Sequence, residues 1–303
     1  MRESSPVAVR SGFQTTSTSL RAGSLPMRLY EKAKRLGTWD PAAIDLSRDA
    51  AGWRELTEPE QLSILQITTV FVAGEEAVTL DLLPLVLAIA REGRLEEELF
   101  LTTFLFEEGK HTQFFRRFLD EVAGAPEGLE RFVTPSYAQL FGDELPRSMN
   151  ALLDDPSPAA QARAAVTYNM IVEGVLAETG YQVYHDALEK RALLPGLREG
   201  LAHVKRDESR HIAYGVYLLS RLVAADPQLW PVVESRMEEL LPLALAFVDE
   251  SFEGFDEQVT PFGITLDQVV GWATSQFRKR YSRIERSRGQ TLAELDALVE
   301  DEL

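Results

Sequence analysis

The chain has 303 residues and contains no cysteine, which excludes disulfides, thiolate metal sites and iron–sulfur clusters. Its formal net charge of −17 argues against binding to nucleic acid, because a phosphate backbone repels an acidic surface. The longest apolar run, Leu80 to Ala90, contains Asp81 and is too short to span a bilayer. Residues 1–24 are rich in Ser, Thr and Arg without an apolar signal segment, so we expect a disordered tail on a cytoplasmic protein.

The first predicted helices follow this tail. Hydrophobic residues make up 45% of the chain, and its Ala, Leu and Glu content favours helix throughout. A first helix is expected at residues 26–36. A longer one begins at a capping box formed by Thr57 and Glu60 and continues to about Arg91. Pro84 is expected to kink this second helix.

Further helices are predicted at residues 95–122, 159–190 and 197–224, and two more at 228–250 and 266–288. A connection with irregular stretches is expected between the first two of these, because Gly and Pro interrupt any long helix there. The interrupting residues are Gly124, Pro126, Pro135, Gly142 and Pro146.

One short motif occurs twice in this series of helices. It reads Glu108-Gly-Lys-His111 in the first copy and Glu208-Ser-Arg-His211 in the second. Residues three apart lie one turn apart on a helix, so each glutamate projects from the same face as its histidine. The repetition predicts that both pairs point toward one place.

Another glutamate precedes each pair: Glu75 lies 33 residues before Glu108, and Glu173 lies 35 residues before Glu208. That spacing suits a helical hairpin, since a helix rises ~1.5 Å per residue and a short turn brings the chain back level. Two such hairpins form a four-helix bundle with a dinuclear carboxylate metal site inside it. Because each hairpin supplies half of the site, residues 25–303 are predicted to be one all-α domain. The predicted ligands are Glu75, Glu108, His111, Glu173, Glu208 and His211.

A single Glu–His pair on a helix usually marks a solvated surface, so the metal hypothesis needs further support. The segments 70–73 and 170–172 around the two preceding glutamates are apolar, and an unpaired carboxylate buried there would be costly. Only four histidines exist, and half of them lie in the motif. Carboxylates and imidazoles together suit iron and manganese, for which dioxygen chemistry is typical. Asp207 is either a hydrogen-bond acceptor for a metal-bound histidine or an exposed helix acid.

The pattern of these glutamates and histidines, with Arg206-Asp207-Glu208 at the last ligand, resembles the ribonucleotide reductase small-subunit superfamily. Within it, the resemblance is closest to the ligand-binding oxidases that share the reductase fold, and it covers residues 25–290. In that family a valine follows the first ligand by three residues, and a tyrosine precedes the third-helix glutamate by five. Val78 and Tyr168 occupy these positions here.

The resemblance implies a ferritin-like four-helix bundle with flanking helices and a heterodinuclear Mn/Fe cofactor, with a di-iron centre as the alternative. It further implies an oxidoreductase that performs two-electron oxidation with dioxygen, binds a long-chain fatty acid at the metals and possesses an ether bond between Val78 and Tyr168. A homodimer is also expected. Without the family, Val78 would be ordinary core and Tyr168 a buried tyrosine. On α-helical geometry, Tyr168 lies about one and a half turns before Glu173.

Three other functions are left open by the sequence. A radical-storing reductase small subunit often has a tyrosine four residues after the first ligand histidine, but Phe115 occupies this position, and the last tyrosine, Tyr281, precedes the C-terminal tail. A dinuclear N-oxygenase would place a histidine four residues before the last glutamate, where Val204 stands beside His203. Ferritin-like metal storage, or lipid binding without catalysis, is the non-enzymatic alternative.

Overall fold

The computed structural model describes residues 20–297, and this part of the chain is helical, with no β-structure beyond one isolated bridge between Val259 and Thr265. The prediction of an all-α fold is therefore confirmed. In chain order the elements are α1 (Leu25–Leu36), η1 (Pro41–Ala43), α2 (Ser47–Glu55), α3 (Glu58–Asp81), α4 (Leu83–Arg91), α5 (Leu95–Glu121), η2 (Leu129–Phe132), α6 (Pro135–Gln139), η3 (Leu140–Glu144), α7 (Leu145–Asp154), α8 (Pro158–Ala165), η4 (Val166–Ala177), α9 (Glu178–Leu188), α10 (Pro195–Ala225), η5 (Pro227–Leu229), α11 (Trp230–Glu250), η6 (Asp256–Gln258), α12 (Leu266–Arg286), η7 (Ser287–Gly289) and α13 (Leu292–Ala297).

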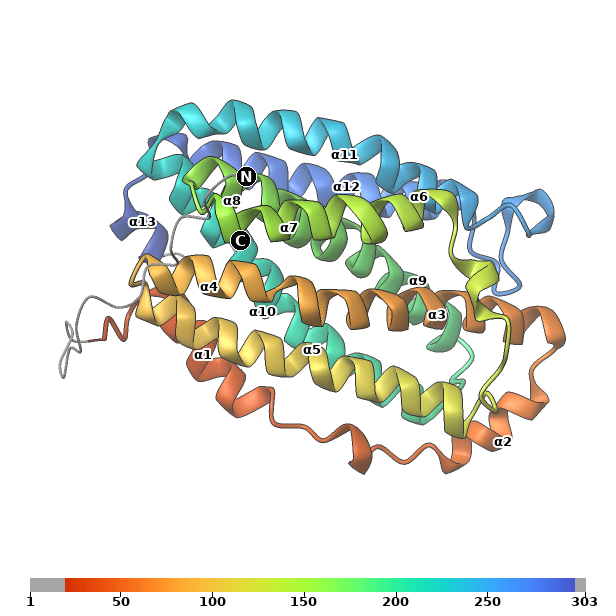
Figure 1. Cartoon of the computed structure of the whole chain (residues 1–303). Helices are drawn as coiled ribbons and strands as arrows, with labels where there is room; N and C mark the ends of the chain where they lie inside the picture. The colour runs from red at the N-terminus through yellow and green to blue at the C-terminus, as the bar shows by residue number, and fades with distance from the viewer. Residues whose placement is uncertain (1–19, 298–303) are drawn as a thin grey trace, which may run out of the picture.

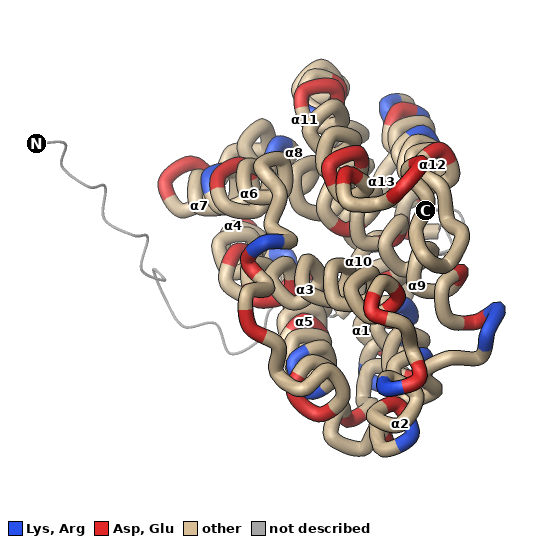
Figure 2. Tube along the Cα trace, turned by 90° about the vertical axis from the view of Figure 1, so that its right-hand side faces the viewer, with Lys and Arg blue, Asp and Glu red and all other residues tan. Residues whose placement is uncertain are grey.

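The long helices run along the length of the molecule (Figure 1). Two hairpins form the central bundle: α3 packs against α5, and η4 packs against α10, which also contacts α5. Helix α1 covers α5 and α10 on one side, while α11 and α12 cover η4 on the other. Seen along the helices, acidic residues are spread over the outer turns, as the net charge leads one to expect (Figure 2). The predicted four-helix bundle with flanking helices is observed.

The capping box and the proline kink are both present in the first hairpin. The backbone N–H of Thr57 donates to Oε2 of Glu60 at 2.8 Å, which satisfies a free donor at the start of α3. Helix α3 ends at Asp81 and α4 begins at Leu83, with Pro84 in the first turn of α4. Proline removes a backbone donor there, so the long predicted helix is divided into two.

The connection after α5 is more regular than predicted. From Pro135 to Asp154 the chain is helical without interruption, through α6, η3 and α7. Pro135 is the first residue of α6, where a missing N–H costs no hydrogen bond, and Pro146 is the second residue of α7, just after the π-helical segment η3 inside the continuous run. Both prolines were expected to interrupt helices, but Pro135 begins a helix and Pro146 lies within one.

The third bundle helix contains a π-helical segment, η4, which the sequence pattern did not predict. A π-helix pairs residue i with residue i+5, so residues five apart lie about one turn apart. Tyr168 and Glu173 are therefore brought toward the same face of the helix. The expected separation of one and a half turns, which assumed α-helical geometry, was wrong for this reason.

Most of the predicted N-terminal tail, residues 1–19, lies outside the described residues. The rest of it contacts the bundle: the backbone N–H of Arg21 donates to Glu96 Oε1 at 2.9 Å, and its guanidinium donates to Asp296 Oδ2 at 3.0 Å. The boundary of the single predicted domain stays a prediction. Within residues 20–297, none of the helices combines the length and apolar character that crossing a bilayer requires.

Candidate metal centre

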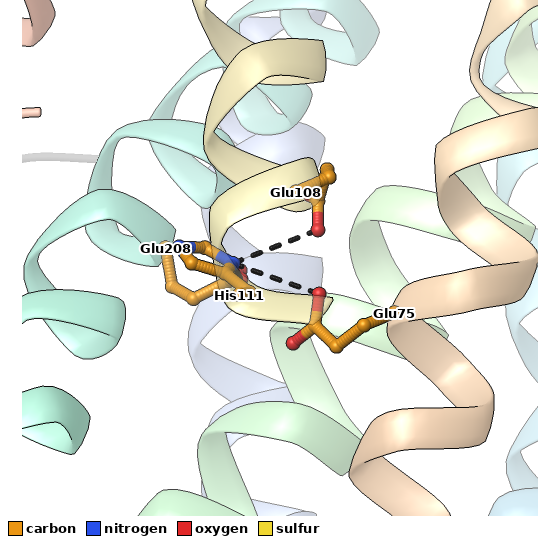
Figure 3. Close-up of side chains that lie close together, drawn as sticks. All are labelled: Glu75, Glu108, His111 and Glu208. Carbon is orange, nitrogen blue, oxygen red and sulfur yellow. Dashed lines mark ion pairs between the residues drawn. The ribbon is translucent and has the colours of Figure 1, made fainter. Parts of the chain in front are cut away.

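The six predicted ligand residues come together in the middle of the bundle, and all are buried. Ligand atoms within 4.8 Å of one another form two groups that share Glu108. Figure 3 shows the first group, in which the side chains from α3, α5 and α10 point toward one another. The first group comprises Glu75, Glu108, His111 and Glu208, and the second comprises Glu108, Glu173 and His211.

Glu108 and Glu208 lie between the two histidines. Oε1 of Glu108 is 3.2 Å from Nδ1 of His211, and its Oε2 is 3.7 Å from Nδ1 of His111. Glu208 shows the same arrangement, with 3.3 Å from Oε1 to His111 and 3.5 Å from Oε2 to His211. Each carboxylate therefore offers one oxygen to each half of the cluster, which is the geometry required of a bridging ligand.

The cluster contains buried polar atoms that no protein group satisfies. Nδ1 of His111, Nδ1 of His211, Oε1 of Glu173 and Oε2 of Glu208 all lack a hydrogen-bond partner. Buried polar atoms without partners are rare, because leaving one unsatisfied costs about 1–3 kcal/mol. Four such atoms in one place, all of them potential metal ligands, fit a pair of divalent cations.

The electrostatics of the cluster also favours added positive charge. Burial and the neighbouring charge of Glu108 raise the pKa of Glu75 well above its ordinary value, and burial and Glu208 do the same for Glu173. Burial lowers the pKa of His211, but Glu208 and other carboxylates outweigh burial and raise it well above its ordinary value. These three shifts have one cause: the buried carboxylates have too little positive charge around them. Metal binding would relieve this shortage by replacing protons.

A carboxylate supports the far nitrogen of each histidine. Nε2 of His111 lies 3.4 Å from Asp207 Oδ2, and Nε2 of His211 lies 2.9 Å from Glu107 Oε2. Such contacts orient an imidazole and leave its other nitrogen for a metal. Asp207 is fully buried, so the hypothesis of a surface acid is wrong. Glu107 was missed, although a signal exists in the sequence: an acid directly precedes the ligand glutamate in both motifs.

Three further groups hold Asp207. Trp39 Nε1 donates to Oδ2 at 2.7 Å, Lys110 Nζ donates to the same oxygen at 3.0 Å, and Arg210 donates to Oδ1 at 2.5 Å. Burial raises the pKa of Asp207, but contacts with His111, Lys110 and Trp39 outweigh burial and lower it well below its ordinary value. Asp207 therefore stays ionised as a fixed acceptor beside the histidine.

Two adjoining cavities lead away from the cluster. The first, of about 70 Å³, is lined by all four ligand glutamates and by apolar side chains. The second, of about 110 Å³, is lined mainly by apolar residues of α3, α9 and α11. They share the wall formed by Val70, Phe71, Leu176 and Phe247. An apolar space that ends at a group of acids suits an amphiphilic ligand.

The two residues of the expected cross-link lie beside the same cluster. Val78 lines the first cavity, and the hydroxyl of Tyr168 donates to Glu108 Oε1 at 3.1 Å. Both side chains are buried, Val78 at 5% and Tyr168 at 0% exposure. Glu108 thus contacts the tyrosine hydroxyl and lines the same cavity as the valine.

Comparison with known proteins agrees with this arrangement. The sequence profile of a family described as ribonucleotide reductase, small chain, matches residues 27–269. The chain belongs to that family. An R2-like ligand-binding oxidase with aerobically reconstituted Mn/Fe cofactor is 40% identical, covers 91% of this chain and 98% of that one, and has a TM-score of 0.86. A mutant of such an oxidase with anaerobically reconstituted Mn/Fe cofactor is 40% identical, with 90% and 98% covered and a TM-score of 0.84. The predicted resemblance and the ferritin-like fold are confirmed.

The residues named for the alternative functions do not belong to the ligand cluster. Phe115 is buried and stacks on Phe71 with ring centroids 5.4 Å apart. The hydroxyl of Tyr281 donates to Glu234, on the outer helices. His203 stacks on Trp39 at 5.1 Å and does not belong to the ligand cluster. These positions favour neither radical storage nor an additional histidine ligand.

Proposed function

We propose that this chain is a dioxygen-activating oxidase with a dinuclear Mn/Fe cofactor, held by the six ligands predicted from the sequence. The observation that carries the proposal is the buried cluster, in which two Nδ1 atoms and two carboxylate oxygens face one another without partners. The similarity to Mn/Fe ligand-binding oxidases at 40% identity supports both the cofactor and the activity. In this assignment Glu108 and Glu208 would each offer one oxygen to either metal position.

When bound, the two metals would supply electrons for the reduction of dioxygen, and the side chains of the chain would prepare the site for that chemistry. The carboxylates neutralise the added charge, and Asp207 and Glu107 orient the histidines. The ring of Phe104 stacks on His211 with centroids 3.6 Å apart and excludes water from that side. A dry, rigid surrounding strengthens each electrostatic contact in the cluster.

The cofactor assignment is tested by metal analysis of protein purified with both manganese and iron available. We expect one ion of each metal per chain, because the two groups of ligands share bridging glutamates and bind two cations together. Protein that contains neither metal, or only zinc at low occupancy, would overturn the proposal. Two iron ions per chain would retain the oxidase and change only the cofactor.

We further propose that a long-chain fatty acid occupies the two adjoining cavities, with its carboxylate at the metals. The ligand glutamates lie at one end of this space, where bound metal ions would attract a carboxylate. The walls at the other end are apolar and suit an acyl chain. The second cavity extends to Phe252 and Phe255, which follow α11 in the sequence. An acyl chain would follow this direction, while the first cavity would hold the carboxylate and the adjacent carbons.

Val70, in the shared wall of the cavities, provides a test of the fatty-acid proposal. In Val70→Phe the larger ring should close the passage, so denaturing extraction and mass spectrometry should release much less long-chain acid than from the wild type. Val232→Phe is the matched control, because Val232 is also half-buried but lines neither cavity. Wild-type protein without any lipid, or equal lipid in both variants, would remove the fatty acid from the proposal.

The proposed cross-link joins the hydroxyl oxygen of Tyr168 to Cβ of Val78. The hydrogen bond from Tyr168 to Glu108 supports it, because this contact holds the phenolic oxygen at the ligand cluster. The position of Val78 in the wall of the first cavity supports it as well. This bond would separate the chain from a radical-storing reductase subunit of the same family.

Location and assembly are proposed on narrower grounds. The absence of cysteine supports the cytoplasm, and cell fractionation tests it. A homodimer is supported by large apolar side chains left exposed on the first hairpin of the bundle, above all Leu80 of α3 at 68% and Phe106 of α5 at 61% exposure. The molar mass in solution, measured by light scattering, distinguishes one chain from two.

A further inference from the structure

The two ligand motifs repeat more than their glutamate and histidine. Each reads acid, glutamate, any residue, base, histidine: 107–111 in α5 and 207–211 in α10. In the structure the acid of each motif contacts the histidine of the other motif. Glu107 of α5 contacts His211 of α10, and Asp207 of α10 contacts His111 of α5. Each histidine is thus oriented by the opposite helix.

Arg210 connects these two acids. Its side chain is fully buried, and one guanidinium nitrogen donates to Glu107 Oε1 and to Asp207 Oδ1, at 2.5 Å each. Another nitrogen donates to the backbone carbonyl of Arg206 at 2.9 Å, which fixes the group along α10. A guanidinium is always charged and planar, so this contact holds the relative position of two carboxylates.

Lys110, the base of the first motif, is placed differently. Its Nζ donates to Asp207 Oδ2 and to the carbonyl of Gly37 at 2.7 Å. Its hydrogen bonds therefore support only the acid beside His111. The two bases are equivalent in the sequence pattern, but in the structure only Arg210 bonds to the acids of both histidines.

We propose that Arg210 is a positioning residue shared by both metal positions. By fixing Glu107 and Asp207 together, it keeps the far nitrogens of His211 and His111 engaged and directs both Nδ1 atoms into the cluster. The inference rests on the proposed dinuclear site, because a positioned imidazole matters only if its free nitrogen binds a metal.

The test measures Mn(II) affinity at each position separately. His111→Ala leaves the position that contains His211, and His211→Ala leaves the one that contains His111. Adding Arg210→Met should weaken Mn(II) binding in both backgrounds, by about tenfold or more, as is typical when a ligand loses its supporting group. Lys110→Met, the matched control, should weaken binding only where His111 remains. Arg210→Lys should restore part of the affinity, because an ammonium group there can still donate to the acids.

Circular dichroism first establishes that each variant is folded. This control is needed because removal of the Arg210 guanidinium leaves two buried carboxylates without their shared positive partner. Arg210→Gln is the second variant for this purpose, because its amide retains a hydrogen-bond donor on a shorter side chain without the charge. If Arg210 substitutions weaken only one position, or neither, the shared role is wrong. If the wild-type chain itself does not bind two ions, the proposed function fails instead, so the two failures are distinguishable.

Discussion

We expect His111→Ala and His211→Ala each to reduce the metal content from two ions per chain to one or fewer. Each substitution removes a neutral donor that no other described histidine can replace, because His203 and His185 lie outside the cluster. Metal analysis after loading with excess manganese and iron measures the effect. His185→Ala is the control and should retain two ions.

The helical fold should survive in both ligand variants. Without cations, burial and neighbouring carboxylates raise the pKa of Glu75 and of Glu173 well above the ordinary value, which favours the uncharged form of each group and lowers the charge repulsion in the centre. The bundle can therefore tolerate an empty centre, and circular dichroism should report wild-type helix content. Two bound ions per chain in both variants would show that the ligand assignment is wrong.

The positions of the ligands could be predicted from the sequence because they depend on local periodicity. Glu108 and His111 share a helix face through their spacing alone, and Glu75 reaches the same level through the length of one hairpin. The second copy repeats this arithmetic. Each copy confirms the other, so a pattern that is weak alone predicts the whole cluster when it occurs twice.

Contacts between distant helices could not be predicted in the same way. The pairing of Glu107 with His211 depends on how α5 faces α10, and the acid motif alone does not say which histidine it will contact. Asp49 of α2 is a second case: it is fully buried and accepts backbone N–H groups of Gly196 and Leu197, at the start of α10. Its sequence context is that of an ordinary surface helix.

The π-helical segment was also hidden from the sequence. Residues 166–177 have the apolar composition of any buried helix, and nothing in it indicates pairing of i with i+5. Tertiary contacts accompany this geometry. Gly174 admits the side chain of Arg280, whose Nε would lie 2.8 Å from a Cβ at that position, and Gly215 admits Asn169 in the same manner. The segment that carries Glu173 is thus shaped by its neighbours.

After aerobic metal loading, we expect a covalent bond between Tyr168 and Val78 that lowers the mass of the chain by two hydrogens, roughly 2 Da. Forming it breaks the phenolic O–H and the tertiary Cβ–H and creates one C–O bond, so two protons and two electrons leave the pair. Dioxygen would accept these electrons when both metals are bound. The unactivated C–H bond requires a strong oxidant, which explains why the bond should form only in air.

Peptide mapping compares protein loaded with and without oxygen, and the cross-linked peptide should appear only in the aerobic sample. Tyr168→Phe should abolish it, because the ring lacks the oxygen, and Val78→Ala should do so by removing the tertiary carbon. Tyr181→Phe is the matched control, because Tyr181 has no part in the proposed bond. Tyr181 is also buried, and its pKa is raised by burial and by the four ligand glutamates. A long-lived oxidised metal site without any cross-link would favour radical storage over oxidase chemistry. An oxidase uses the oxidised metal site to oxidise groups within that site, and the cross-link would record this reaction. A reductase subunit instead retains the oxidised state for transfer to a partner protein.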